Sequence, residues 1–158
     1  MARRVVDDDM RWYQPVQIEE VTSFDPGLAA SLRGLMSQLS PRAAPATDEN
    51  VQEILDSPAT RLLVARDDDD AVVGSLTLVM FRIPTGVGVW IEDVIVDEAA
   101  RGRGIGEALL REGVELAARA GASRVNLTST PDRVAANRLY QRLGFEPRTT
   151  NVYRLELS

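Results

Sequence analysis

The sequence predicts an α/β fold with a mixed sheet and helices on both faces of the sheet. Strand-like and helix-like segments follow one another in the order β-α-α-β-β-β-α-β-α-β. The chain has 158 residues, of which 44% are hydrophobic and 27% charged, as in one globular domain. Residues 1–13 mix charges without a period and predict a flexible tail, so we expect a single domain over 14–158.

The first part of this domain is predicted to form a strand and two helices. The alternating run VQIEEV (16–21) is typical of a strand, and LAASLRGLMSQL (28–39) has its apolar residues at helical spacing. The segment TDENVQEIL (47–55) predicts a short second helix with acidic residues in its first turn. Polar side chains that cap helices precede both: Ser23 or Asp25 for the first and Thr47 for the second.

Three apolar strands are expected in the middle of the chain. RLLVARD (61–67) and AVVGSLTLVMFR (71–82) flank the acidic run at 67–70, which is typical of a solvated hairpin turn. IPTGVG (83–88) contains proline and two glycines and predicts a loop. VWIEDVIV (89–96) then predicts a strand that is apolar except for two acids.

The last third of the chain predicts two helices and two strands. A helix follows the glycine-rich segment after residue 96 and ends near Ala120, before a glycine. SRVNLTST (123–130) predicts a strand, and Thr-Pro-Asp at its end predicts a helix over 131–143. The alternating run NVYRLEL (151–157) predicts an edge or hairpin strand.

The composition excludes several kinds of chemistry. The chain has no cysteine, so disulfides, thiolate metal sites and a cysteine nucleophile are excluded. It also has no histidine, the usual general base and metal ligand, and all 18 basic residues are arginine, which excludes a Schiff-base lysine. Proton transfer must therefore use Asp, Glu, Tyr, water or a chain terminus.

The charge and the N-terminal sequence indicate where the protein acts. A net charge of −6 disfavours nucleic acid as a partner and fits a cationic substrate. The N-terminal MARRVVDDDMRW lacks the apolar run of a signal peptide, and no run has the length of a membrane helix. We therefore expect no membrane partner and a cytoplasmic location. The arginine-only, alanine-rich composition is typical of a GC-rich bacterial gene.

The segment RGRGIG (101–106) predicts an anion site between a strand and a helix. A dinucleotide fingerprint requires G-x-G-x-x-G, but its third glycine would fall on Glu107 or on Leu109. A P-loop requires a lysine, which the chain lacks. A simple turn explains one or two glycines but not three flanked by arginines. Free amides at the start of the helix instead favour a phosphate group.

Two motifs resemble those of the GNAT N-acetyltransferase superfamily. Arg101-x-x-Gly104-x-Gly106 matches the first motif of this superfamily, and N-x-x-Y-x-x-x-G-F at 137–145 matches the second. The resemblance implies a mostly antiparallel mixed sheet with a splayed parallel strand pair that binds CoA, formed by 89–96 and 124–129. It also implies acetyl-CoA as the co-substrate, an amine as the acceptor and no metal.

The resemblance assigns residues to the CoA site. The pantetheine arm is expected to pair with the backbone of the strand that ends at residue 96, and the pyrophosphate to bind the glycine segment. On the other side of CoA, one helix contributes an amide and a phenol. The expected CoA-binding residues are Val94, Ile95, Val96, Arg101, Gly102, Arg103, Gly104, Ile105, Gly106, Asn137 and Tyr140.

Two residues are candidates for proton transfer. By resemblance, Tyr140 is the general acid that protonates the departing thiolate; the alternative is a core aromatic with a hydrogen-bonded hydroxyl. Glu92 interrupts an apolar strand, where burial raises a carboxyl pKa, so it is the favoured base. Strand alternation places it with Trp90 and Val94. The alternative bases are Asp93, which lies on the opposite face, and a water relay. The alternative role for Glu92 is an ion pair with an arginine.

The acceptor remains open at the level of sequence. The stretch from the strand to the glycine segment also resembles enzymes that acetylate small phosphorylated amines, for which Arg133 could bind a phosphonate or carboxylate. Arg148, Thr149 and Thr150 are further candidates for the acceptor site. Because no cysteine is available for an acetyl-enzyme, direct attack by the amine is expected. Two alternative functions remain: a catalytically silent CoA-binding sensor and a nucleotide-binding protein. Pairing through 151–157 could also form a homodimer.

Overall fold

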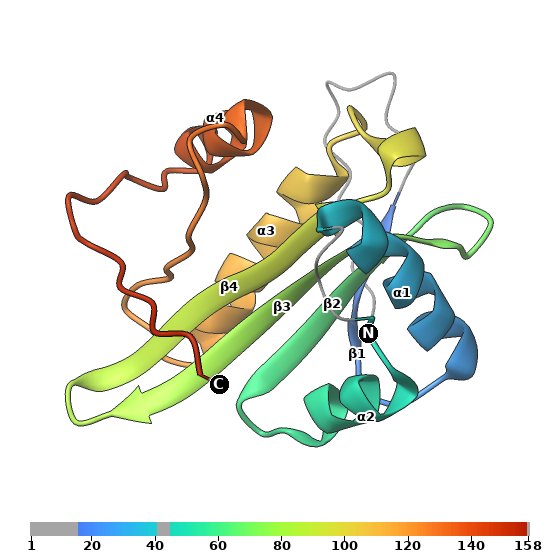
Figure 1. Ribbon diagram of the computed structural model, residues 1–158, viewed down its shortest axis with the longest axis horizontal. Coiled ribbons are helices and arrows are strands. Elements are labelled where there is room, and N and C mark those ends of the chain that lie inside the picture. The colour runs from blue at the N-terminus through green and yellow to red at the C-terminus, as the bar shows by residue number, and fades with distance from the viewer. Residues whose placement is uncertain (1–15, 41–44, 158) are drawn as a thin grey trace. The chain divides into compact units, whose positions relative to one another are not determined.

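The computed structural model describes residues 16–40 and 45–157 (Figure 1). The tail predicted for residues 1–13 lies outside this part of the chain. The chain divides into two compact units, one up to Leu127 and one from Thr128, and each is described by itself. A single domain over 14–158 therefore stays a prediction.

The first unit contains a four-stranded antiparallel sheet. Its strands lie in chain order and pair with their sequence neighbours (Figure 1). Alternating and β-branched segments form all of them, as expected. The strands are β1 (Gln17–Val21), β2 (Thr60–Arg66), β3 (Val72–Ile83) and β4 (Gly86–Val96).

The hairpin between β3 and β4 is tighter than the loop predicted over 83–88. Gly86 has a φ of 134°, a conformation that glycine readily adopts, and this permits the chain to reverse over two residues. Two residues later, Gly88 pairs with Phe81, and a Cβ at Gly88 would clash with the Phe81 ring. The missing side chain at Gly88 therefore lets the two strands continue to pair where the sequence indicates a loop.

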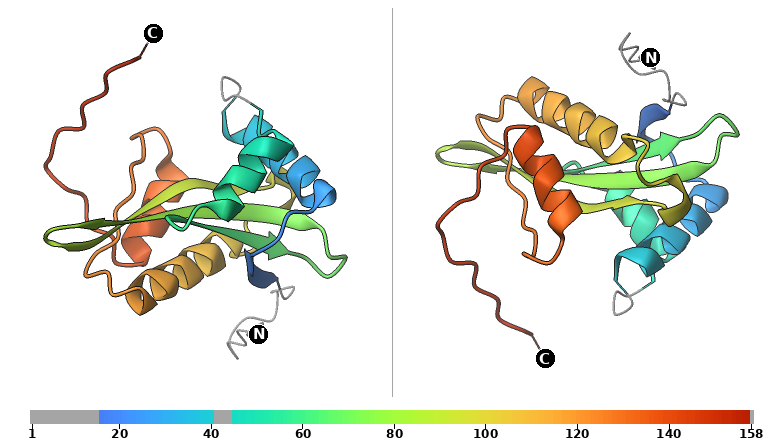
Figure 2. Two further views of the ribbon diagram at one scale, coloured as in Figure 1. Left: turned by 90° about the horizontal axis from the view of Figure 1, so that it is seen from below. Right: turned by 90° about the horizontal axis from the view of Figure 1, so that it is seen from above.

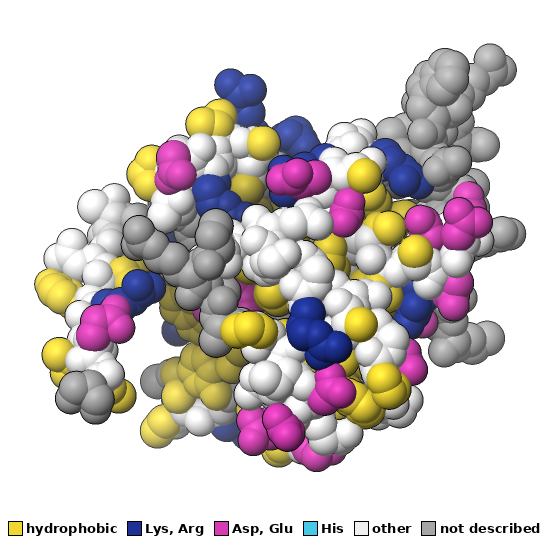
Figure 3. All heavy atoms as spheres, turned by 45° about the vertical axis from the view of Figure 1, so that its right-hand side comes forward, with side chains coloured by type: hydrophobic (Ala, Val, Ile, Leu, Met, Phe, Trp, Pro, Cys, Tyr) yellow, Lys and Arg dark blue, Asp and Glu magenta, His cyan; other side chains and the backbone are white. Residues whose placement is uncertain are grey.

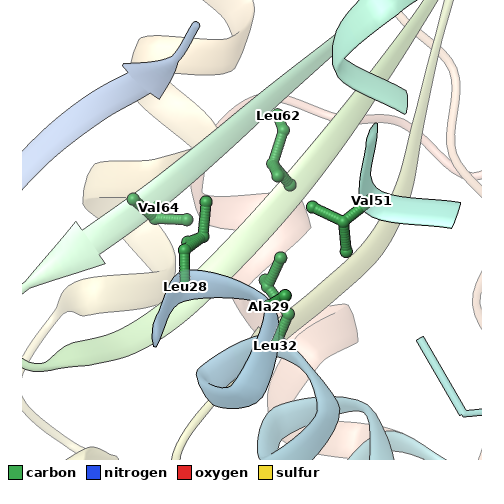
Figure 4. Close-up of a cluster of buried hydrophobic side chains, with 6 residues drawn as sticks. All are labelled: Leu28, Ala29, Leu32, Val51, Leu62 and Val64. Carbon is green, nitrogen blue, oxygen red and sulfur yellow. The ribbon is translucent and has the colours of Figure 1, made fainter. Parts of the chain in front are cut away.

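Helices cover both faces of this sheet, as predicted. The helices α1 (Pro26–Leu39) and α2 (Asp48–Asp56) lie on one face, and α3 (Ile105–Arg119) lies on the other (Figure 2). On the first face, side chains from α1, α2 and β2 point toward one another (Figure 4). This buried cluster consists of Leu28, Ala29, Leu32, Val51, Leu62 and Val64.

Helix caps and close packing explain where these helices form. Asp25, rather than Ser23, caps α1, since its Oδ2 accepts a hydrogen bond from the Leu28 amide at 2.9 Å. Thr47 caps α2 in a reciprocal capping box. On the opposite face, Gly113 of α3 allows close contact with the leucines of β3, 3.4 Å from the position of its absent Cβ.

The strand predicted over 123–130 is wrong except at Asn126. This residue forms a parallel bridge with Trp90, in which the Ile91 amide donates to the Asn126 carbonyl at 2.8 Å and the Asn126 amide donates to the Val89 carbonyl at 2.9 Å. The bridge gives the otherwise antiparallel sheet its mixed character. Among the described residues of the first unit, no further backbone pairing is recorded on this side of β4 after Ile91, although the Val96 carbonyl accepts a hydrogen bond from the Arg101 side chain.

The second unit contains α4 (Val134–Arg142), which begins three residues later than predicted. The Arg133 amide donates to the Thr130 carbonyl at 3.1 Å, and this turn delays the helix. The predicted strand over 151–157 is also wrong. A strand needs a neighbour for its backbone, and the described chain records no backbone hydrogen bond for 146–157.

The charged side chains are mixed over the surface. On the face drawn in Figure 3, acidic and basic side chains are interspersed among the coloured residues. Several arginines pair with acids, including Arg66 with Glu19 at 2.7 Å and Arg119 with Glu112 at 3.0 Å. In the part of the chain that the structure describes, no helix is long and apolar enough to cross a membrane.

Candidate functional site

The glycine segment forms a turn with two left-handed glycines. After β4, a short 3₁₀ helix, η1 (Glu98–Ala100), leads into the turn, and α3 follows. Gly102 and Gly104 have φ values of 78° and 74°, which strain any L side chain. Gly104 is left-handed and is followed by Ile105, the first right-handed helical residue, and such a pair turns its amides toward one point and forms a nest that binds anions. The backbone geometry therefore supports the anion site predicted from RGRGIG.

The first turn of α3 adds to this site. Its N-cap is Gly104, and no side chain caps the helix. The first amides of a helix have no partner within it and carry the positive end of the helix dipole. Apart from its neighbours in the chain, no atom of the described residues lies within 4 Å of the Cβ position of Gly102, so the described part of the chain leaves space beside the turn. This arrangement fits a phosphate group, which needs several donors and room to approach.

Arg101, at the start of the turn, contacts the residues just before it. Its Nε donates to the Val96 carbonyl at 3.2 Å, and its guanidinium lies 3.7 Å from the Glu98 carboxylate. Arg101 therefore braces the end of β4. Arg103 lies between the two left-handed glycines. The backbone of the turn is thus the clearest source of donors for an anion.

A bulge in β4 lies just before the turn. Thr77 of β3 pairs with Glu92, but Ser75 pairs with Ile95, so β4 contains one extra residue here. Asp93 occupies the bulge with a φ of 49°, which few residues other than glycine adopt. The predicted pantetheine-binding residues 94–96 follow directly. The described residues of the first unit record no backbone pairing at this outer edge of β4, where only the Val96 carbonyl is held, by Arg101.

The bulge changes which side chains share a face. Since Thr77 and Ser75 lie two apart on β3, their partners Glu92 and Ile95 lie on the same side of the sheet. The prediction that Glu92 shares its face with Val94 is therefore wrong, although Trp90 does share it. A single inserted residue shifts the alternation by one position, which the strand pattern cannot reveal.

Glu92 has the electrostatic character expected of a base. Partial burial raises its pKa above the ordinary value of 4.5, and the nearby Asp93 carboxylate raises the pKa further. The residue is nevertheless exposed, so it is accessible to solvent. Among the described residues, Glu92 is not part of any recorded ion pair, which weighs against the alternative that an arginine occupies it.

Tyr140 and Asn137 lie on α4 in the second unit. Tyr140 is 7% exposed, and its ring meets the Phe145 ring edge-on with 6.1 Å between centroids. Burial raises the pKa of Tyr140, while the charge of Arg133 opposes this effect. Asn137 Nδ2 donates to the Thr130 carbonyl at 2.9 Å and so fixes the turn before α4. This contact was not expected from the motif.

The remaining candidates for the acceptor site are exposed. Arg133 precedes α4, and Arg148, Thr149 and Thr150 lie in the extended segment after it. Their exposure leaves them available to a ligand but assigns none of them a role.

Sequence reasoning missed Gln38 and Asp97. Gln38 Nε2 donates to Asp97 Oδ2 at 3.0 Å, which joins the end of α1 to the start of the glycine turn. These residues are 59 positions apart, so no local spacing could have paired them.

Comparison with known proteins gives a consistent result. A sequence model of the Acetyltransferase (GNAT) family matches residues 31–145. Glucosamine 6-phosphate N-acetyltransferase 1 of Oryza sativa subsp. japonica is 34% identical over 123 residues, which are 71% of each protein.

Two solved structures share the fold. A Trypanosoma brucei acetyltransferase has a TM-score of 0.72 and 24% identity, over 90% of this chain and 99% of its own. The aminoglycoside acetyltransferase AAC(6')-Iy, solved with the bisubstrate analogue CoA-S-monomethyl-acetylneamine, has a TM-score of 0.72 and 20% identity over the same shares.

Proposed function

Because the chain belongs to the GNAT acetyltransferase family, whose members are acyltransferases, we propose that it transfers acetyl from acetyl-CoA to the primary amine of a small molecule or peptide. A catalytically silent sensor that binds CoA is the alternative within the same family. The two differ in whether bound acetyl-CoA is consumed when an amine is present.

The single observation that carries the proposal is the glycine turn before α3. Left-handed glycines at 102 and 104, an uncapped helix start and open space beside the turn form a site for the CoA pyrophosphate. No backbone partner is recorded for the outer edge of β4 at 94–96 among the described residues of the first unit, which supports backbone pairing with the pantetheine arm; only the Val96 carbonyl is already held there, by the Arg101 side chain. The residues proposed to bind CoA are Val94, Ile95, Val96, Arg101, Gly102, Arg103, Gly104, Ile105, Gly106, Asn137 and Tyr140.

The proposed reaction is a direct transfer. The amine nitrogen attacks the thioester carbonyl, a C–N bond forms, and the C–S bond breaks as CoA leaves as a thiol. Binding both reactants together supplies several kcal/mol of the rate enhancement, about 7–11 in the most favourable cases. Glu92 accepts the ammonium proton through water, since its raised pKa makes it a stronger base than an ordinary carboxylate. Asp93 is the alternative base.

Tyr140 is the proposed acid for the leaving group. Its pKa is raised by burial, so the phenol keeps its proton at neutral pH and can donate it to the departing thiolate. Contact with Phe145 limits the positions that the ring can adopt. If Tyr140 served only in packing, it would not need its hydroxyl. Removal of the hydroxyl therefore distinguishes a role as the acid from a role in packing.

A small phosphorylated amine is the first acceptor to test. The rice relative is named for glucosamine 6-phosphate, and the strand and glycine segment resemble enzymes for such substrates. Arg133 and Arg148 are exposed in the second unit and could bind the phosphate. Aminoglycosides are the second class to test, because AAC(6')-Iy was solved with an acetylneamine conjugate.

A thiol-release assay with acetyl-CoA tests the proposal. The panel should contain amino-sugar phosphates, aminophosphonates, aminoglycosides, polyamines, amino acids and peptide N-termini. We expect amine-dependent release of CoA with at least one class. Calorimetry with acetyl-CoA, CoA and ATP provides the control: binding of ATP without CoA would contradict the proposal, and CoA binding without turnover on any amine would favour the silent sensor.

Location and assembly are secondary proposals. We expect a cytoplasmic bacterial protein with no nucleic-acid or membrane partner and no metal requirement. Because residues 151–157 are exposed, they are the proposed segment for contact between the two chains of a homodimer. Light scattering of the purified chain measures its mass, and a mass of 17.3 kDa at all concentrations would contradict the dimer.

A further inference from the structure

We propose that Gln38 is a positioning residue whose side-chain amide holds the glycine turn in the conformation that binds the CoA pyrophosphate. This inference rests on the proposed function, because it assigns the turn to CoA. It adds a residue from outside both sequence motifs and links the end of α1 to the donor site.

The contacts of Gln38 use both ends of its amide. Nε2 donates to Asp97 Oδ2 at 3.0 Å, and Oε1 accepts from the Glu98 amide at 3.0 Å. These two bonds fix the orientation of the amide, since reversing it would place donor against donor and acceptor against acceptor. Figure 1 shows the end of α1 beside the end of β4, where these bonds form.

Asp97 is the centre of this connection. Its Oδ1 accepts from the Ala99 amide at 2.9 Å, and its own amide donates to the Val73 carbonyl of β3 at 2.9 Å. One residue therefore joins α1, β3 and the 3₁₀ helix η1. The bond from Gln38 is the largest cause that lowers the pKa of Asp97, so the carboxylate stays ionised at neutral pH and the bond is charge-assisted.

The turn needs such support because of its glycines. Glycine loses more backbone freedom on ordering than any other residue. Beyond its two neighbours in the chain, none of the described residues has an atom within 4 Å of the Gly102 Cβ position that would restrict it. The turn is therefore held at its ends: α3 holds one end, and the contacts of Asp97 and Glu98 hold the other. A turn ordered in advance binds its ligand with less loss of entropy.

The test compares two acetyl donors. Acetyl-CoA carries the pyrophosphate, whereas S-acetylpantetheine carries the thioester and pantetheine arm without it. For Gln38→Ala and Gln38→Glu we expect the KM for acetyl-CoA to rise about tenfold, as for the loss of a hydrogen bond to a charged group. We expect kcat with acetyl-CoA, and kcat/KM with S-acetylpantetheine, to stay within about twofold.

A rescue variant separates positioning from general stability. In Gln38→Glu the carboxylate faces that of Asp97, but in the double variant Gln38→Glu/Asp97→Asn the donor and acceptor are exchanged and both bonds can form again. We expect the double variant to recover the KM for acetyl-CoA. Ser37→Ala is the matched control, because the recorded bond of Ser37, to the Gly34 carbonyl at 2.7 Å, stays within α1.

Two results would overturn the inference: equal losses with both donors, or no recovery in the double variant. Hydrogen exchange of the ligand-free chain tests the tether separately from the function. The amide of Glu98 should exchange faster in Gln38→Glu and return to its original rate in the double variant. If the unaltered chain binds no acetyl-CoA, the proposed function fails, while exchange still decides whether Gln38 orders the turn.

Discussion

Glu92 and Asp93 form an acidic pair whose members have different backbones. Asp93 occupies the left-handed bulge, whereas Glu92 keeps its strand pairing with Thr77. Burial and the neighbouring charge favour the protonated form of Glu92 and so raise its pKa. At this scale, the pair explains how a strand carboxylate can serve as a base in a chain without histidine.

The pH dependence of the reaction should follow this pair. A base acts in its ionised form, so activity should be lost as pH falls through the raised pKa of Glu92. Asp93→Asn removes the like charge, lowers the pKa of Glu92 and should move the acid limb to lower pH. The measurement is kcat/KM for the amine as a function of pH, at saturating acetyl-CoA. An unchanged acid limb in Asp93→Asn would contradict coupling between the two carboxylates.

Glu92→Gln should reduce kcat about 10²-fold or more, within the range for loss of a general base. The folded state should not become less stable at neutral pH. A group with a raised folded pKa adds stability only below its unfolded pKa, and that stability is lost as pH rises through the folded pKa. A kinetic assay with a parallel denaturation curve checks both expectations. If Glu92→Gln were nearly as active as the unaltered chain, Asp93 or water would be the base instead of Glu92.

Tyr140→Phe tests the proposed acid. The ring and its contact with Phe145 remain, so the fold and CoA binding should persist. Loss of the hydroxyl should lower kcat by about 10²-fold, within the range for a general acid. Stopped assays give kcat, and calorimetry gives the affinity for CoA. Full activity would identify Tyr140 as a packing residue, the alternative reading of the motif.

At the scale of elements, the glycine turn and α3 act together. In the proposed anion site, the turn would supply its backbone amides and the helix its uncapped first turn. Neither would suffice alone, since a helix start without open space beside it cannot accept a phosphate. The relevant conformations are the two positive φ values, and only glycine adopts these at little cost.

Gly102→Ala and Gly121→Ala form a matched pair. Their φ values are 78° and 82°, and in the described part of the chain neither has an atom within 4 Å of its Cβ position other than those of its chain neighbours. Each substitution should therefore cost about 1–2 kcal/mol of stability through backbone strain alone. Only Gly102→Ala should weaken CoA binding, by about tenfold or more, because Gly121 lies at the other end of α3. Calorimetry and urea denaturation measure the two effects, and equal affinities would contradict the assignment of the turn.

At the scale of the whole molecule, acetyl-CoA binding should stabilise the fold. A ligand at 100 times its Kd adds about 2.7 kcal/mol to the free energy of unfolding. We therefore expect acetyl-CoA and CoA to raise the Tm of the chain, and ATP and NAD to leave it unchanged. Differential scanning fluorimetry over a range of ligand concentrations provides the measurement. A rise in Tm with ATP alone would favour the nucleotide-binding alternative.

Much of the fold could be predicted from local pattern. The helices α1, α2 and α3 and the four strands form where period and caps indicate, except that β3 and β4 continue into the predicted loop at 83–88, because these signals act over a few residues. The expected strands at 123–130 and 151–157 fail for one reason. Alternation shows that a segment can pair, but the presence of a partner depends on residues far away in the chain.

The sequence by itself determined the available chemistry and the family. The lack of cysteine, histidine and lysine limits the chemistry, and the motifs at 101–106 and 137–145 indicate the family. Both kinds of evidence require only residue identity and short spacing. Tertiary structure alone decided the bulge at Asp93, the bracing of Arg101 and the bonds of Gln38 to Asp97 and Glu98 before the glycine turn. Strand register and contacts across 59 residues arise from packing of the whole sheet, which no short segment specifies.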